Sequence, residues 1–345
     1  MNLTKSAQLL DHALQNGIFP CYAAAIGQGK DIWFYKSKGY RTLYPQKALL
    51  TEDTRFDMAS LSKLIGTTMA ALRLIENGKL SLFNTVGDYF DQCYGKENIT
   101  IRDLMTHTSG IPAHIPLYLR NIQPETAADV ILQEALAYPT GSETVYSCMG
   151  YILLGKILEK IESESLDRIV TRFVLEPLSM GQSGYCPQSG TPCASTEWDP
   201  ASGTYLNGTV HDENARFLGG ISGNAGLFCT LGDAVRFAQM LSLRGKGFLS
   251  SRMFELAITD FTPDCSESRG LGFQLYGGKR FPGGDLMSLG SYGHTGFTGT
   301  SIYVDNKTGI YAVLLTNRVH PTRENGRIIP FRWHFHNTIF SSIKE

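Results

Sequence analysis

Residues 56–63 read Phe56-Asp57-Met58-Ala59-Ser60-Leu61-Ser62-Lys63, so a serine stands three residues before a lysine, after a short apolar run. The mostly apolar residues 61–75 predict a helix that begins beside Ser60. Side chains three apart on a helix share one face, about 5–6 Å apart at Cβ. The free N–H groups and positive dipole end of a helix N-terminus suit an oxyanion and favour an uncharged amine at Lys63. The stretch therefore predicts a serine nucleophile whose proton Lys63 accepts.

The same S-x-x-K spacing recurs at Ser341-Ser342-Ile343-Lys344, so partner motifs must decide. For a tyrosine motif, Tyr205-Leu206-Asn207 is a literal Y-x-N, whereas Tyr146-Ser147-Cys148 is not. Tyr146 is nevertheless followed by an apolar helical run at residues 149–158, and Tyr205 is not. We prefer Tyr146 because its neighbours place it at the start of a buried helix.

Two segments also compete for a third motif. Lys307-Thr308-Gly309 is a literal K-T-G, but it lies between two β-rich runs and reads as a hairpin turn. His294-Thr295-Gly296 instead opens a strand-like stretch, residues 297–301, whose small residues would let a substrate backbone approach closely. We prefer His294.

With these choices the chain resembles the penicillin-recognising serine hydrolases, in the branch that holds class C β-lactamases, DD-peptidases with an H-T-G motif, D-amino-acid amidases and carboxylesterases. Further segments resemble the family pattern in family order: residues 103–112, residues 210–228 and Leu315-Thr316-Asn317-Arg318. The family's tyrosine motif usually ends in Asn, and Cys148 occupies that place.

The resemblance implies that Ser60 attacks a carbonyl to form an acyl-enzyme, which water then hydrolyses. Lys63 and Tyr146, a phenol acidified by neighbouring cations, would handle the proton. The backbone N–H groups of Ser60 and Phe297 would form the oxyanion hole. Cys148, His294, Thr295 and Gly296 would contact the substrate, with His294 charged only at lower pH.

Composition agrees with one enzyme chain of 345 residues, of which 42% are hydrophobic and 18% charged, with a formal net charge of −1. Such a balance does not indicate a nucleic-acid partner. The first twelve residues read as an amphipathic helix without a secretory apolar core, which predicts a cytoplasmic protein without a membrane partner. Seven scattered cysteines argue for reduced thiols, and neither a metal site nor a cofactor is expected.

The expected fold class is α/β (α+β), similar to β-lactamases and DD-peptidases. Strands expected at 22–26, 32–35, 272–276, 299–304 and 311–316 imply one antiparallel sheet formed by both chain ends, with helices near 1–16 and 231–243. Helices near 127–137 and 150–161 lie in the middle of the chain. We therefore expect a sheet domain of residues 1–83 and 226–345 and a mainly helical inserted domain of residues 84–225, with the active site between them.

Three functions remain open from the sequence. The first is a serine hydrolase acting on small esters or amides, including D-amino-acid peptides. The second is a β-lactamase or DD-carboxypeptidase. The expected cytoplasmic location argues against this function. The third is a penicillin-binding protein without turnover, or an inert scaffold. The oligomeric state is not predicted.

Overall fold

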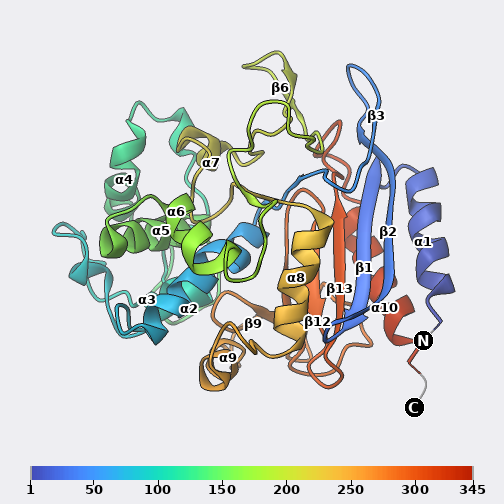
Figure 1. The fold of residues 1–345 in the computed structure, drawn as a ribbon. Helices are drawn as coiled ribbons and strands as arrows, with labels where there is room; N and C mark the ends of the chain where they lie inside the picture. The colour runs from blue at the N-terminus through green and yellow to red at the C-terminus, as the bar shows by residue number, and fades with distance from the viewer. Residues whose placement is uncertain (1, 344–345) are drawn as a thin grey trace.

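The structure is a computed structural model that describes residues 2–343, and it is built around one large antiparallel sheet (Figure 1). The sheet has eight strands in the order β3-β2-β1-β13-β12-β11-β10-β9. In that order they span Ala48–Leu49, Asp31–Thr42, Cys21–Gln28, Ile310–Thr316, Ser301–Val304, Tyr292–Thr295, Gln274–Leu275 and Ser268–Arg269. Because β1 pairs with β13, with Ala24 opposite Leu314, the two ends of the chain meet at the centre of the sheet. The predicted fold class is confirmed.

Alternating residues of the central strands bury the two faces of the sheet in separate cores. Ala23 and Ala25 of β1 join a core under the helices of the middle of the chain. Their neighbours Ala24 and Ile26 join a second core under the terminal helices. This period of two is what a strand covered on both faces requires.

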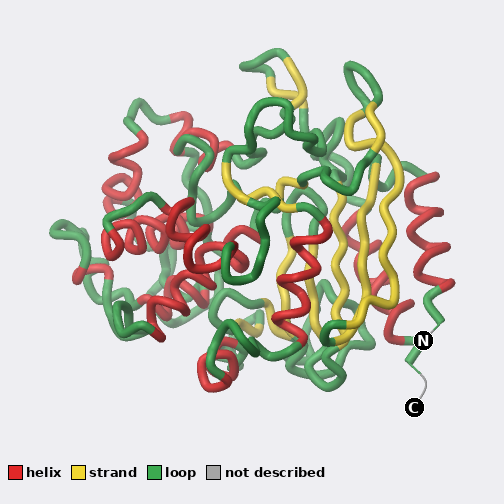
Figure 2. Tube along the Cα trace, viewed as in Figure 1, coloured by secondary structure: helices red, strands yellow, loops and turns green. Residues whose placement is uncertain are grey.

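Helices cover both faces (Figure 2). The first and last helices, α1 and α10, pack together on one face, and α8 packs against β1, β12 and β13 on the other. The α-helices from α1 to α10 span Thr4–Gln15, Met69–Glu76, Ile101–Thr106, Ala127–Gln133, Cys148–Glu162, Leu166–Val170, Glu213–Phe217, Leu231–Ser242, Ser251–Ala257 and Ile328–Phe340. Short 3₁₀ turns lie at Val86–Asp88, Leu117–Leu119 and Pro124–Thr126, and π-helical turns at Lys63–Thr68 and Thr171–Leu175.

The helices α3 to α7 all fall within residues 84–225 and gather beside the sheet (Figure 1). The fold also contains two small sheets. One consists of β4 (Phe56–Asp57), β8 (Leu227–Cys229) and β5 (Gly184–Tyr185). The other consists of β6 (Trp198–Asp199) and β7 (Thr204–Tyr205). The first of these sheets joins residues 56–57, just before Ser60, to the middle of the chain. The division of the chain into two domains at residues 83 and 225 stays a prediction.

Three predicted elements are shorter than expected, for local reasons. The helix at 127–137 ends at Gln133 because Glu134 adopts extended backbone angles, with φ −62° and ψ 144°. The strand at 272–276 is reduced to β10 since Gly272 has φ +75°, and the strand at 299–304 begins at Ser301 since Gly299 has φ +111°. A left-handed residue cannot continue a strand.

No helix within residues 2–343 combines the length and apolar character needed to cross a membrane. The same part of the chain holds no cluster of three or more His, Cys, Asp or Glu side chains arranged to bind a metal ion.

Candidate active site

Ser60 lies at a sharp turn between β4 and the following helix. Ala59 before it has φ +46°, an uncommon conformation for a residue with a side chain. The carboxylate of Asp57 holds this turn, because its Oδ1 accepts a hydrogen bond from the Ala59 N–H across 2.8 Å. Helical backbone begins at Leu61, as the sequence predicts, and becomes π-helical from Lys63 to Thr68, which it does not predict.

Lys63 is buried, and its ammonium faces the serine. Its Nζ donates to Ser60 Oγ across 3.2 Å, to Cys148 Sγ across 3.4 Å and to the carbonyl oxygen of Asn224 across 2.9 Å. Burial by itself lowers the pKa of Lys63, but the negative charge that Cys148 and Tyr146 can carry raises it, and the net pKa lies above its ordinary value. The expectation of an uncharged amine is therefore wrong for the free protein.

Tyr146 packs against Lys63, whose Nζ lies 4.9 Å from the centre of the phenol ring. The rings of His107 and His294 lie 4.6 Å and 5.8 Å from it, centre to centre. Its hydroxyl is buried and has no hydrogen-bond partner among residues 2–343. Burial raises the pKa of Tyr146 and outweighs the opposing effect of Lys63, so the expected acidified phenol is also wrong.

His294 is buried and uncharged. Its Nδ1 lies 2.7 Å from the carbonyl oxygen of Thr295. A carbonyl can only accept, so Nδ1 carries the proton and Nε2 has a free lone pair. Burial, followed by the charges of Arg269 and Lys63, lowers the pKa of His294 to about 3. The third motif therefore brings no positive charge at any physiological pH.

His294 and Thr295 end β11, and the next five residues form a turn, not the expected strand. The Gly296 N–H donates to the Thr300 carbonyl across 2.7 Å, which closes the turn around Phe297. Thr300 Oγ1 donates to the Met58 carbonyl across 3.2 Å. Only glycine fits at position 296, since a Cβ there would lie 2.4 Å from the Met58 oxygen. The turn that carries Phe297 is thus fixed against the segment that carries Ser60.

Two arginines, Arg318 and Arg332, donate hydrogen bonds to carbonyl oxygens of this turn. Arg318 Nε donates to the Phe297 carbonyl across 2.8 Å, and its guanidinium carbon lies 4.3 Å from the centre of the Phe297 ring. Arg332 Nη2 donates to the carbonyl oxygens of Gly296 and Thr300, each across 2.9 Å. No sequence motif marks Arg332, whereas Arg318 stands in the family-like Leu315-Thr316-Asn317-Arg318.

A third arginine, Arg269 of β9, was also missed. Its side chain is 2% exposed, and its guanidinium carbon lies 5.5 Å from the centre of the Tyr146 ring. Nη2 pairs with Glu267, while Nε and Nη1 have no partner among residues 2–343. The surrounding Ser268-Arg269-Gly270 contains no pattern that marks a site, so only the fold reveals it.

The rejected motifs lie in other settings. Tyr205 stacks on Tyr44, with ring centres 5.7 Å apart, and meets His320 edge-on at 4.9 Å. Lys307 belongs to the hairpin between β12 and β13, where Thr308 Oγ1 donates to Asp305 Oδ1 across 2.7 Å, as expected of a turn. In the second S-x-x-K stretch, at residues 341–344, Ser341 follows α10 and Lys344 lies outside the described residues.

Other residues of the family-like segments make structural contacts. His107 Nδ1 accepts from the Ser147 N–H across 3.1 Å, and burial lowers the pKa of His107 well below its ordinary value. Asp212 caps α7 by accepting from the Ala215 N–H across 2.8 Å. All seven cysteines are free thiols.

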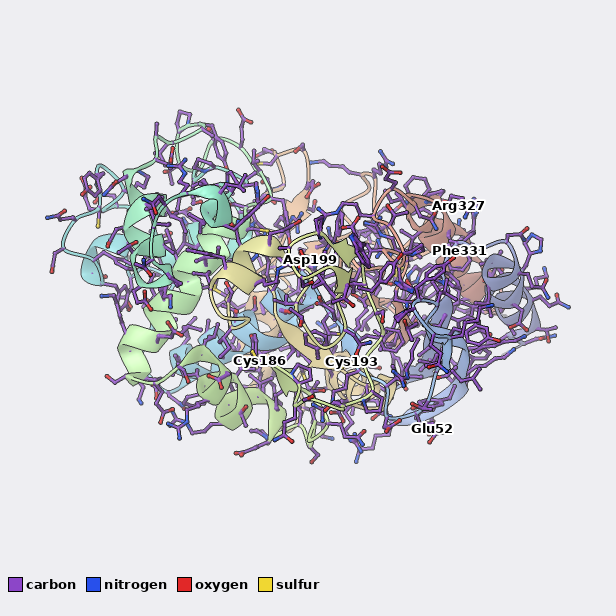
Figure 3. All side chains as sticks on the ribbon, turned by 90° about the horizontal axis from the view of Figure 1, so that it is seen from above. Glu52, Cys186, Cys193, Asp199, Arg327 and Phe331 are labelled. Carbon is purple, nitrogen blue, oxygen red and sulfur yellow. The ribbon has the colours of Figure 1, made fainter. Side chains whose placement is uncertain are left out.

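A hollow of about 700 Å³ opens near Phe297. Glu197 and Arg323 both line the hollow and pair with each other. The Arg323 guanidinium carbon also lies 6.0 Å from the centre of the Phe297 ring, which relates the hollow to that ring. Aromatic side chains line it as well, namely Tyr118, Trp198 and Phe217. Seen from above, Asp199 of its rim lies between the helices and the sheet (Figure 3).

Comparison with known proteins shows the family of the chain. Residues 7–335 match the family model described as Beta-lactamase. A "Putative D-alanyl-D-alanine carboxypeptidase" of Salmonella enteritidis PT4 (strain P125109) is 30% identical over 366 residues, which cover 93% of this chain and 84% of the relative.

Two solved structures share the fold. One, described as "EstCE1, a hydrolase with promiscuous acyltransferase activity", has a TM-score of 0.80 at 22% identity and covers 98% of both chains. The octameric penicillin-binding protein homologue from Pyrococcus abyssi has a TM-score of 0.74 at 23% identity, covering 95% of this chain and 76% of that one. The chain therefore belongs to the β-lactamase family and is a serine hydrolase.

Proposed function

We propose that Ser60 is the nucleophile of a hydrolase that cleaves small esters or amides through an acyl-enzyme. The observation that carries this proposal is the contact of Lys63 Nζ with Ser60 Oγ at 3.2 Å, within a buried group that includes Tyr146. A serine hydroxyl is a weak nucleophile at its own pKa, and an adjacent base is the usual means of activating it.

Lys63 and Tyr146 act as one proton-handling pair. In the free protein the lysine is an ammonium and the tyrosine a neutral phenol, so the pair must lose one proton before it can accept the proton of Ser60. When Ser60 Oγ attacks the carbonyl, its proton passes to the pair and then to the leaving group. Water next attacks the acyl carbon and gives its proton to the pair, which passes it to Ser60 Oγ as the bond between Oγ and the acyl carbon breaks.

The Ser60 and Phe297 N–H groups form the oxyanion hole in this proposal. Its support is the rigidity of the Phe297 turn, which Thr300 ties to Met58 and which Arg318 and Arg332 hold from the other side. Donors fixed in advance stabilise a developing charge without reorganising during the reaction. His294, Thr295 and Gly296 would border the leaving-group side.

Cys148 favours esters over amide-flanked substrates. A thiol is a weak donor and a weak acceptor, and Sγ already receives a hydrogen bond from Lys63. The hollow lined by Tyr118, Trp198 and Phe217 offers room for the apolar part of a small substrate. The free thiols support a reducing compartment such as the cytoplasm.

A DD-carboxypeptidase is the second candidate, and Arg269 is the observation that favours it. This guanidinium is buried beside Tyr146 with two nitrogens unpartnered, and a substrate carboxylate would satisfy them. Since His294 is neutral, Arg269 offers a positive charge near Tyr146 for such a carboxylate. The name of the Salmonella relative agrees with this alternative.

Pre-steady-state kinetics with a p-nitrophenyl ester, a chromogenic cephalosporin and an N-acylated D-alanyl-D-alanine separates the candidates. Turnover of the ester with little turnover of the others supports the main proposal. Faster turnover of the peptide than of the ester would replace it with the carboxypeptidase. A burst equal to one enzyme equivalent without turnover on any substrate would make the protein a binder that stays acylated.

A further inference from the structure

We propose that a second pocket, one wall of which is formed by α10, binds a small carboxylate that has an apolar body. The pocket has a volume of about 280 Å³ and lies between β9, β10 and α10. Its lining residues are Glu267, Ser268, Gln274, Leu275, Lys279, Arg280, Phe281, Pro282, Ile329, Arg332 and Trp333. Arg327 and Phe331 mark the helix that forms one wall (Figure 3).

The first observation is an excess of positive charge. Lys279, Arg280 and Arg332 all line the pocket, and none of them has a carboxylate partner within residues 2–343. Lys279 Nζ donates only to backbone carbonyls, that of Pro263 across 3.0 Å and that of Cys265. The one acidic lining residue, Glu267, is already paired with Arg269. An anion would therefore meet three cations that no carboxylate of the described chain neutralises.

The second observation is that Arg332 is buried with unused hydrogen-bonding capacity. Its side chain is 7% exposed, and Nε has no partner in the described part of the chain. Burial lowers the pKa of Arg332 to about 10, so the guanidinium still keeps its charge at neutral pH. A buried cation without a counter-ion is unfavourable, and an anionic ligand relieves that cost.

The third observation concerns the body of the ligand. Phe281, Trp333, Ile329 and Leu275 supply apolar surface, and the Arg280 guanidinium lies 4.8 Å from the centre of the Trp333 ring. At about 280 Å³ the volume lies just under the usual range of ligand pockets, roughly 300–1,000 Å³. Cations beside aromatic walls in so small a space fit a compact aromatic or branched aliphatic carboxylate better than a bare inorganic anion or a nucleotide.

This pocket is distinct from the hollow near Phe297, since the two share no lining residue. Arg332 nevertheless connects it with the turn, because the same guanidinium that lines the pocket holds the carbonyls of Gly296 and Thr300. The proposed binding of a carboxylate in this pocket does not depend on which substrate Ser60 accepts.

Isothermal titration of the whole protein with benzoate tests the proposal, with benzamide as the neutral analogue of the same shape and inorganic phosphate as the anion without an apolar body. We expect benzoate to bind at least tenfold more tightly than either, since a hydrogen bond to a charged group changes affinity by roughly 10- to 150-fold. Benzamide binding as tightly as benzoate would overturn the charge argument. Phosphate binding as tightly would overturn the apolar one.

Variants locate the site. Lys279 and Arg280 are exposed, so the double variant K279Q/R280Q should fold normally and weaken benzoate binding about 2- to 10-fold, the scale of exposed charge pairs. Arg332→Gln should weaken it further. Arg252→Gln, which removes an exposed cation of α9, is the control and should change nothing. If Arg332→Gln does not fold, as judged by circular dichroism, the double variant alone decides: unchanged benzoate affinity in it contradicts the proposal.

Discussion

Lys63 Nζ donates a hydrogen bond to Cys148 Sγ across 3.4 Å, at the position where the family pattern has an asparagine. Cys148 is the first residue of α5 and lies beside the proposed catalytic pair, where it also packs against the hydrophobic core. The amide of an asparagine there would both accept from Lys63 and donate to a substrate carbonyl, and a thiol replaces only the first of these bonds.

We therefore expect Cys148→Asn to raise kcat/KM for a penicillin or an acylated D-peptide more than for a p-nitrophenyl ester. The missing hydrogen bond to a group buried on binding costs about 1–3 kcal/mol, or roughly 5- to 150-fold in relative rate. Steady-state kinetics on both substrates measures the ratio. Cys186→Asn, at an exposed cysteine, is the control. An equal change for both substrates would show that Cys148 does not set acyl-side selectivity.

Ser60→Ala should abolish covalent labelling by a fluorophosphonate, because the Ser60 hydroxyl has the Lys63 amine beside it. Ser341→Ala should leave labelling intact, since Ser341 Oγ donates to the Thr338 carbonyl at the end of α10. Intact-mass spectrometry reports the adduct. An adduct that survives in Ser60→Ala would refute the nucleophile assignment.

Tyr146→Phe should lower kcat/KM by roughly 10²-fold or more, the usual effect of losing a general acid–base group. The hydroxyl forms no hydrogen bond of normal geometry in the described chain, although Lys63 and Ser60 lie near enough to act on its pKa, so the fold should be unaffected. Tyr205→Phe is the matched control and should leave kcat/KM nearly unchanged. The reverse ranking, at equal melting temperatures, would make the literal Y-x-N the catalytic motif.

The pH profile of kcat/KM should rise from neutral to alkaline pH. The pKa values of Lys63 and Tyr146 are both raised, and the pair serves as a base only after losing a proton, so the active form accumulates as pH increases. His294, with a pKa of about 3, stays neutral from pH 5 to 8. His294→Asn should therefore not move the profile in that range.

His294→Lys should move the rise to lower pH, by about one unit or more, because a cation beside Tyr146 favours its phenolate. Initial rates at sub-saturating ester between pH 5 and 10 give both profiles. A profile of the natural protein that falls with increasing pH above 7 would contradict the assignment of the base.

Gly296→Ala should reduce kcat by roughly 10²-fold or more, the scale seen when one oxyanion donor is lost. The added Cβ would lie 2.1 Å from Thr300 Oγ1 and 2.4 Å from the Met58 oxygen, so the turn carrying Phe297 must shift. Gly181→Ala is the control, since its Cβ would meet no atom within 4 Å. Single-turnover kinetics separates a slower acylation from altered binding, and unchanged acylation would exclude Phe297 from the oxyanion hole.

The sequence by itself determined the fold class and the pairing of Ser60 with Lys63, because both depend on local spacing. The short, mostly apolar run of β1 and the apolar run after Ser60 are patterns that a single segment carries. It also separated the hairpin at Lys307 from the motif at His294, since turn residues between two β-rich runs form a local pattern.

Only the tertiary structure decided the charge state of the site. Tyr146 remains a phenol because it is buried, and Lys63 remains an ammonium because Cys148 and Tyr146 lie beside it from a distant part of the chain. A local pattern shows neither of these causes. Arg269 and Arg332 escaped the sequence analysis for the same reason. Neither arginine stands in a sequence pattern that marks a site. The fold buries Arg269 beside Tyr146 and Arg332 beside Gly296, and both partners lie far away in the chain.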